Sequence, residues 1–147
     1  IFTTALPPPV AAAATTAIRH LKASSGEREG QRRAVAATRA RLLEARLPVV
    51  DTPTHILPVM IGDAQLCKAA SDRLLAQHDI YIQPINYPTV PKGTERLRIT
   101  PTPLHDEARI EQLVVALAET WDHLGLARGE GEVADGVPRS IFAVSGG

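Results

Sequence analysis

The chain has 147 residues, with 16 lysines and arginines against 16 aspartates and glutamates, so its formal net charge at pH 7 is zero. This balance does not indicate a nucleic-acid partner, and an aromatic content of 3% argues against stacking platforms for single strands. No apolar run approaches the roughly 18 residues of a membrane span, and the single cysteine, Cys67, excludes an internal disulfide.

The first third of the chain is expected to be helical. The sequence begins with Ile1 and shows no basic region of a signal peptide, so we expect it to start in mid-domain and to belong to a cytoplasmic protein. The alanine-rich stretch 10–23 predicts a helix that ends near Gly26. Ser25 is expected to cap a second helix, which Pro48 ends.

Short strands and helices alternate from residue 55 onward. The apolar stretch 55–61 predicts a strand with a bulge or a sheet edge at Pro58, and Asp63 is expected to cap a helix over 64–77. The stretch 80–82 predicts a second strand. Three prolines then exclude a regular element from 83–92 and predict a stiff loop.

The last strand and helix have the clearest patterns. Alternation over 95–100 puts Leu97 and Ile99 on one face of a strand, with Arg96 and Arg98 on the other. Apolar residues at helical spacing predict a helix over 106–126. From residue 48 to 128 the pattern predicts a small α+β domain with a short, largely antiparallel sheet and helices on one face, preceded by helices over 1–47. The tail 129–147 is expected to be disordered.

Standard motifs reveal no catalyst and no metal site. The histidines form no i, i+4 pair, the serines lack a nucleophile elbow, and no glycine-rich phosphate loop is present. Two side chains remain as candidates. Arg98 is suited to hold a carboxylate by two parallel hydrogen bonds, and the hydroxyl of Thr89 is suited to donate to a second acidic group. Residue type and spacing alone favour solvated roles for both residues.

Four stretches of the chain follow a known family pattern: FTTALPP (2–8), HILPVMIGD (55–63), IQPINYPTVP (82–91) and GTERLRITPTP (93–103). With these stretches the chain resembles the C-terminal part of the 5-aminolevulinate synthases, a branch of the α-oxoamine synthases, over about residues 1–126. The stretch NYPTVP is typical of the aminolevulinate branch. Residues 1–47 then correspond to the end of a large domain and its connecting helices.

The resemblance implies a homodimeric, pyridoxal-phosphate-dependent enzyme of fold type I that condenses glycine with succinyl-CoA. Its products are 5-aminolevulinate, CoA and carbon dioxide, at the start of tetrapyrrole and heme biosynthesis. Arg98 matches the arginine that holds the substrate carboxylate, and Thr89 matches a loop threonine near the succinyl carboxylate. Thr3 or Thr4 falls in the segment that approaches the cofactor phosphate across the dimer interface.

The catalytic lysine of the resembled family has no counterpart here. The lysines are Lys22, Lys68 and Lys92, and none stands in that family's cofactor-binding context. We therefore expect this chain alone to be inactive and to represent a portion of a larger enzyme. Two alternatives stay open: a sister α-oxoamine synthase that uses another acyl-CoA, and a non-catalytic module that binds a small carboxylate or a protein partner.

Overall fold

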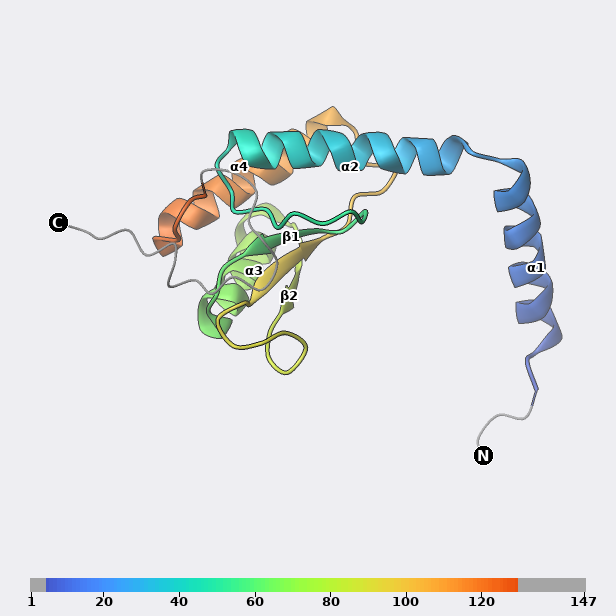
Figure 1. The fold of residues 1–147 in the computed structure, drawn as a ribbon, viewed down its shortest axis with the longest axis horizontal. Coiled ribbons are helices and arrows are strands. Elements are labelled where there is room, and N and C mark those ends of the chain that lie inside the picture. Colours follow the sequence, from blue (N-terminus) through green and yellow to red (C-terminus); the bar gives the residue numbers. More distant parts are fainter. Residues whose placement is uncertain (1–4, 130–147) are drawn as a thin grey trace.

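The computed structural model describes residues 5–129, so Thr3, Thr4 and residues 130–147 of the predicted tail lie outside the described part. Four helices and three strands make up the described residues (Figure 1). In chain order they are α1 (Pro8–Ala23), α2 (Gly26–Glu44), β1 (Leu57–Met60), α3 (Ala64–His78), β2 (Gln83–Ile85), β3 (Arg96–Ile99) and α4 (Glu107–Leu124). The predicted α+β class is confirmed.

The sheet is antiparallel and has β3 at its centre, with the strand order β1-β3-β2. Leu57 pairs with Ile99 and Val59 with Leu97, and all four side chains are buried in the hydrophobic core. Strand β1 is the outermost of the three strands, but Pro58 does not lie at a free edge as expected, because its carbonyl accepts a hydrogen bond from the backbone N–H of Val50 at 2.8 Å. A further antiparallel bridge joins Val59 to Val49, in the segment that follows α2.

Helix α3 packs against β2 and β3, α4 packs against α2 and α3, and both α3 and α4 begin at an aspartate cap. Asp63 accepts a hydrogen bond from the backbone N–H of Leu66 at 2.8 Å, and Asp106 accepts one from Arg109 at 2.9 Å. The predicted cap at Asp63 and the predicted bounds of both helices are thereby confirmed to within two residues. The fully buried Trp121 of α4 donates from its indole nitrogen to the carbonyl of Ala127 at 3.2 Å.

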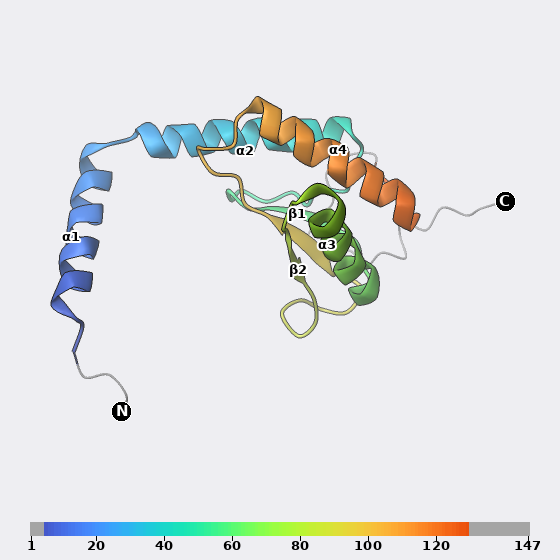
Figure 2. The same ribbon diagram turned by 180° about the vertical axis from the view of Figure 1, so that it is seen from behind.

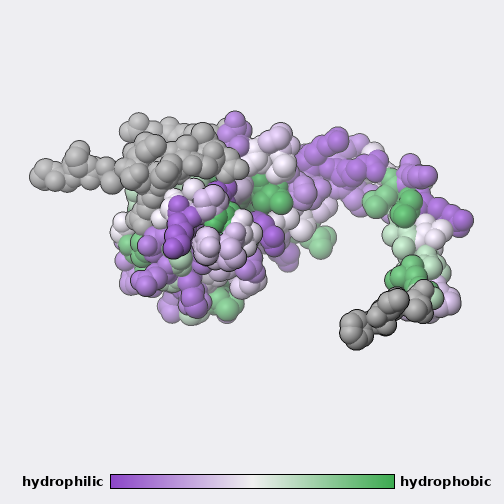
Figure 3. All heavy atoms as spheres, turned by 60° about the horizontal axis from the view of Figure 1, so that its bottom comes forward, coloured by the Kyte–Doolittle hydropathy of each residue, from purple (hydrophilic) through white to green (hydrophobic). Residues whose placement is uncertain are grey.

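Helix α2 crosses the domain beside α4, whereas α1 turns sharply away from it (Figures 1 and 2). The C-terminal half of α2 joins the core through Leu42, but α1 has no buried residue. Apolar side chains of α1, including Ile18 and Leu21, are exposed, and they appear as green patches on that helix in Figure 3. In the described structure, α1 therefore contributes no side chain to the core.

Ser25 occupies the position before α2, but its side chain does not cap the helix as expected. Its hydroxyl donates instead to the carboxylate of Glu29 at 2.7 Å. The neighbouring hydroxyl of Ser24 donates to Glu27 at 2.6 Å, and His20 of α1 lies 2.6 Å from the same carboxylate. Side-chain contacts across the α1–α2 junction thus replace a conventional serine cap.

The second strand lies three residues later than predicted. Residues 80–82 are not a strand, and β2 spans Gln83–Ile85 within the stretch from which we excluded regular structure. Pro84 is tolerated because β2 is an edge strand that pairs with β3 alone, so the missing N–H of the proline breaks no ladder on the other side. The loop that follows β2 accordingly spans residues 86–95.

No helix within residues 5–129 combines the length and the apolar character that crossing a lipid bilayer requires.

Candidate functional site

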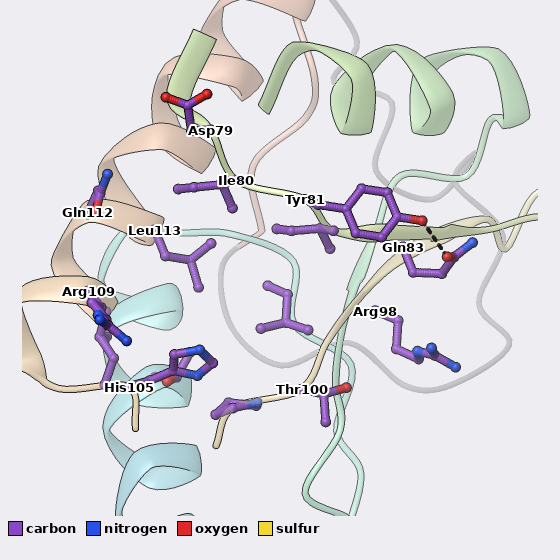
Figure 4. A pocket seen from close by; sticks show the side chains of 15 residues that line it. Asp79, Ile80, Tyr81, Gln83, Arg98, Thr100, His105, Arg109, Gln112 and Leu113 are labelled. Atoms are coloured by element: carbon purple, nitrogen blue, oxygen red, sulfur yellow. Dashed lines mark hydrogen bonds between the residues drawn. The ribbon is translucent and has the colours of Figure 1, made fainter. Parts of the chain in front are cut away.

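A cavity of about 480 Å³ opens where β3 ends beside the start of α4 (Figure 4). Its lining comes from α2, from the segment between α3 and β2, from β3 with the residues after it, and from the first turns of α4. Isoleucines 80, 82, 99 and 110 give it an apolar lining, while Arg98, His105 and Arg109 contribute cationic or polar groups. An apolar hollow with a few polar groups is typical of a small-molecule site.

Arg98 lies on the exposed face of β3, opposite Pro58 on one neighbouring strand and Gln83 on the other. Within residues 5–129 no hydrogen bond or ion pair engages its guanidinium group. The structure therefore leaves its planar set of N–H donors available to an incoming anion, for which a carboxylate has the matching geometry. The strand beneath it is held by the core, which restricts where the side chain can reach.

Arg96, two residues earlier on the same face, does not share this exposure. Its side chain is buried, and its Nε donates to the carbonyl of Thr94 at 2.8 Å. Arg96 and Arg98, which alternation puts on one face of the strand, therefore differ in exposure. Alternation predicts on which face of a strand a side chain lies, but its exposure to solvent depends on residues distant in the sequence.

The far side of the cavity is built by the turn before α4. His105 accepts a hydrogen bond at Nδ1 from the backbone N–H of Thr102 at 3.0 Å, and Arg109 donates to the carbonyl of Leu104 at 3.3 Å. These two side chains lie across the hollow from Arg98 and Gln83 (Figure 4). These two hydrogen bonds fix the conformation of the turn before α4.

Gln83 closes the other side of the cavity beside Arg98. Its side-chain oxygen accepts a hydrogen bond from the hydroxyl of Tyr81 at 2.6 Å (Figure 4). Its side-chain nitrogen donates to the carbonyl of Pro84 at 3.1 Å. Both ends of the amide are thereby held, which fixes a polar group next to the guanidinium of Arg98.

Thr89 does not line this cavity. It is exposed in the loop between β2 and β3, where its backbone N–H donates to the carbonyl of Asn86 at 2.9 Å. The β2–β3 hairpin has the Gln83–Arg98 pair at one end and the Ile85–Arg96 pair at the other. The loop that carries Thr89 leaves the hairpin at the Ile85–Arg96 end, away from Arg98. The two candidate side chains are therefore not brought into one hollow by the described residues alone.

Buried polar groups hold the returning arm of this loop. The buried Glu95 accepts a hydrogen bond from the backbone N–H of Gly93 at 2.9 Å, and Gly93 adopts a φ of 85° that a residue with a side chain rarely takes. The Thr94 hydroxyl donates to the carbonyl of Pro91 at 2.7 Å. Lys92 lies 5.3 Å from the centre of the Tyr87 ring, within the range of a cation–π contact.

Cys67 is buried in α3 among core residues. Burial raises the pKa of its thiol to about 11, and the nearby carboxylates of Glu95 and Asp63 act in the same direction. A thiol held in its protonated form at neutral pH is a poor nucleophile, so its properties are those of a core residue.

The sequence did not single out Tyr81, Gln83, His105 or Arg109 as site residues. They come from segments separated by more than twenty positions, and no spacing motif connects them. Only the packing of α4 against α2 and α3, which brings the start of α4 beside the end of β3, places them in one hollow. A pattern search has no means of finding such a set.

Comparison with known proteins identifies the family. The family model of the class I and II aminotransferases matches residues 1–117. The chain is 61% identical over 126 residues to the 5-aminolevulinate synthase of Bradyrhizobium diazoefficiens, a match that covers 86% of this chain and 31% of that protein. It is 52% identical over 132 residues to the mitochondrial 5-aminolevulinate synthase of Schizosaccharomyces pombe, covering 89% of this chain and 24% of the relative.

Solved structures show the same fold. A serine palmitoyltransferase from S. paucimobilis, solved with bound PLP and myriocin, superimposes with a TM-score of 0.75 at 29% identity, covering 85% of this chain and 32% of that one. The chain spans about a third or less of the length of these proteins. The predicted resemblance to the 5-aminolevulinate synthases is confirmed, and the chain belongs to the class I and II aminotransferase family.

Proposed function

We propose that this chain is a portion of a 5-aminolevulinate synthase, the pyridoxal-phosphate-dependent enzyme that condenses glycine with succinyl-CoA and releases CoA and carbon dioxide. The product feeds tetrapyrrole and heme biosynthesis. The identity of 61% to the enzyme of B. diazoefficiens, against 29% to a serine palmitoyltransferase, favours this branch over one that uses another acyl-CoA.

One observation carries the proposal: Arg98 is exposed on a rigid strand, lines a cavity, and has no acidic partner within residues 5–129. In the proposed enzyme this guanidinium holds the carboxylate of the amino-acid substrate by two parallel hydrogen bonds. Fixing that carboxylate orients the Cα substituents of glycine, which is the geometric requirement for breaking one chosen bond. A lysine would supply the charge without the planar fork.

The described residues do not by themselves fit pyridoxal phosphate. Lys68 pairs with Asp72 on the surface of α3 at 2.5 Å, Lys92 lies over Tyr87, and no lysine lines the cavity of Arg98. We propose that the covalent attachment of the cofactor requires residues beyond this chain and that the chain alone does not turn over substrate.

In the homodimer of the proposed enzyme, Thr89 donates its hydroxyl to the succinyl carboxylate. Its exposed position in a loop with internal hydrogen bonds supports this role. Thr3 or Thr4 contacts the cofactor phosphate from the partner subunit; both residues lie outside the described part of the chain.

A chimeric enzyme tests the proposal. The matching stretch of the B. diazoefficiens enzyme is replaced by this chain, and 5-aminolevulinate formation is measured at varied glycine concentration. We expect an active chimera whose kcat/KM for glycine falls at least about 30-fold on Arg98→Leu, since loss of one partner from a desolvated charge pair costs about 2–5 kcal/mol. Arg33→Leu, at an exposed position of α2 that does not line the cavity, serves as the matched control.

Each outcome of this experiment is informative. A chimera that folds but is inactive would refute the proposed function. If the chimera is active and Arg98→Leu leaves the glycine kinetics unchanged, Arg98 does not bind the substrate carboxylate. The proposed function would then be supported by sequence similarity alone. Binding of glycine without turnover would favour the alternative of a module that binds a small carboxylate.

A further inference from the structure

A second hollow, of about 670 Å³, lies between one flank of α2 and the segment that leads into β1. We call it the α2 groove and define it by the residues that carry its charge and polarity: Arg28, Arg32, Arg39, Asp51, Thr52 and His55. One wall is the solvent-facing side of α2, where hydrophilic side chains gather in Figure 3. The other wall is the segment 51–55 that leads into β1.

The three arginines share one face of α2. They are spaced by four and seven residues, which on a helix of 3.6 residues per turn keeps them within about 40° of one another. With a rise of about 1.5 Å per residue, Arg28 and Arg32 are offset by about 6 Å along the helix axis, and Arg39 lies about 10 Å further on. The arginines therefore form a row that faces the groove.

This row lacks a matching row of acids. Asp51 is the one carboxylate in the lining of the groove. The glutamates of α2 are engaged elsewhere: Glu27 with Ser24 and His20, Glu29 with Ser25, and Glu44 with Arg41 at 2.8 Å. The groove thus carries excess positive charge although the net charge of the whole chain is zero.

The arginines at the two ends are held in place by backbone carbonyls. Arg28 donates to the carbonyl of Leu21 at 2.6 Å, and Arg39 donates to that of Thr52 at 2.9 Å, across the groove. Arg32, between them, is exposed, and no hydrogen bond or ion pair within residues 5–129 engages it. Two anchored guanidinium groups flank one that is available to a ligand.

From this arrangement we propose that the α2 groove is a binding site for a diphosphate group, independent of the cavity of Arg98. Guanidinium groups bind phosphate oxygens through paired hydrogen bonds, and a diphosphate presents oxygens to two neighbouring arginines at once. Arg32 and the remaining N–H donors of Arg28 make the contacts. The volume accommodates inorganic pyrophosphate or the diphosphate of a nucleotide.

Isothermal titration of the chain with pyrophosphate, ADP and adenosine tests the proposal. We expect pyrophosphate and ADP to bind and adenosine not to bind. Arg32→Gln is expected to weaken both anions about tenfold or more, the effect of losing a charge-assisted contact. Arg33→Gln removes the same charge from the neighbouring exposed position outside the groove, and we expect it to leave the affinity unchanged.

Equal affinity for pyrophosphate and ADP would assign the site to the inorganic anion, and tighter binding of ADP would assign it to a nucleotide. The proposal is overturned if neither anion binds, if adenosine binds as well as ADP, or if Arg32→Gln and Arg33→Gln weaken binding equally, which would indicate unspecific attraction. Arg32→Lys keeps the charge without the fork and is expected to give an intermediate affinity. Arg32→Lys serves as the test if Arg32→Gln perturbs the fold. An affinity of Arg32→Lys equal to that of the unaltered chain would refute the proposed paired hydrogen bonds from the Arg32 guanidinium group.

Discussion

Replacing Ser71 with alanine is expected to destabilise the fold although it removes a single oxygen. The hydroxyl of this buried α3 residue donates to the carbonyl of Ile82 at 2.7 Å, and Ile82 lies outside the regular strand in the wall of the Arg98 cavity. In Ser71→Ala the carbonyl loses this donor while it stays buried. An unsatisfied buried acceptor costs about 1–3 kcal/mol, so we expect the free energy of unfolding to fall by this amount.

Thr38→Val supplies the matched control. The hydroxyl of Thr38 is also buried and also donates to a carbonyl at 2.7 Å, that of Ala34. This carbonyl lies within α2, where the backbone N–H four residues later is its regular helical partner. Removing the hydroxyl therefore leaves no orphaned acceptor, and valine keeps the shape of the side chain. We expect a change of less than about 1 kcal/mol.

Urea unfolding of the chain, followed by the fluorescence of its one tryptophan, the buried Trp121, measures both changes. A shift in midpoint without a change in slope reports stability alone. Equal losses in Ser71→Ala and Thr38→Val would refute the reasoning, because the cost would then follow the lost hydroxyl rather than the orphaned carbonyl.

Three further predictions concern caps and titrating groups. Asp63→Ala is expected to lower the free energy of unfolding by about 1–2 kcal/mol and Asp63→Asn by less, because asparagine keeps the bond to the end of α3; equal losses would contradict this. Cys67, whose pKa burial raises to about 11, is expected to resist a thiol reagent at pH 8 until urea unfolds the chain. Hydrogen bonds from Ser24 and His20 lower the pKa of Glu27 from 4.5 to about 2, so its stabilising effect is present above pH 4.5 and is lost as the pH falls toward 2. An NMR titration midpoint of Glu27 near 4.5 would disprove the last prediction.

Helices α3 and α4 were predictable because local and tertiary signals agree in them. Each starts at an aspartate that caps it, and each carries apolar residues at helical spacing that the core then buries. The sequence prediction placed strand β2 three residues too early because the local signals conflict. The apolar residues 80–82 suggested a strand, whereas the pairing with β3 falls on 83–85, and Pro84 is permitted only by the edge position.

The candidate site was predictable only in part. Sequence alternation placed Arg98 on the outer face of β3, but the same rule placed Arg96 there with equal weight, and only the resemblance to a family separated the two. The structure separates them physically, since Arg96 is buried and Arg98 is exposed. His105 and Gln83 had no local signal at all, because their proximity is created by packing between segments far apart in the chain.

The small sheet determines the face from which Arg98 projects. Leu97 and Ile99 of β3 are buried on one face, so Arg98 between them must point to the other. A slip of one residue would bury Arg98 and expose both apolar neighbours, a change that the core strongly disfavours. The contacts that stabilise the domain therefore also determine where Arg98 points. In the proposed enzyme, the precision of carboxylate binding is thus a consequence of core packing on the opposite face of the same strand.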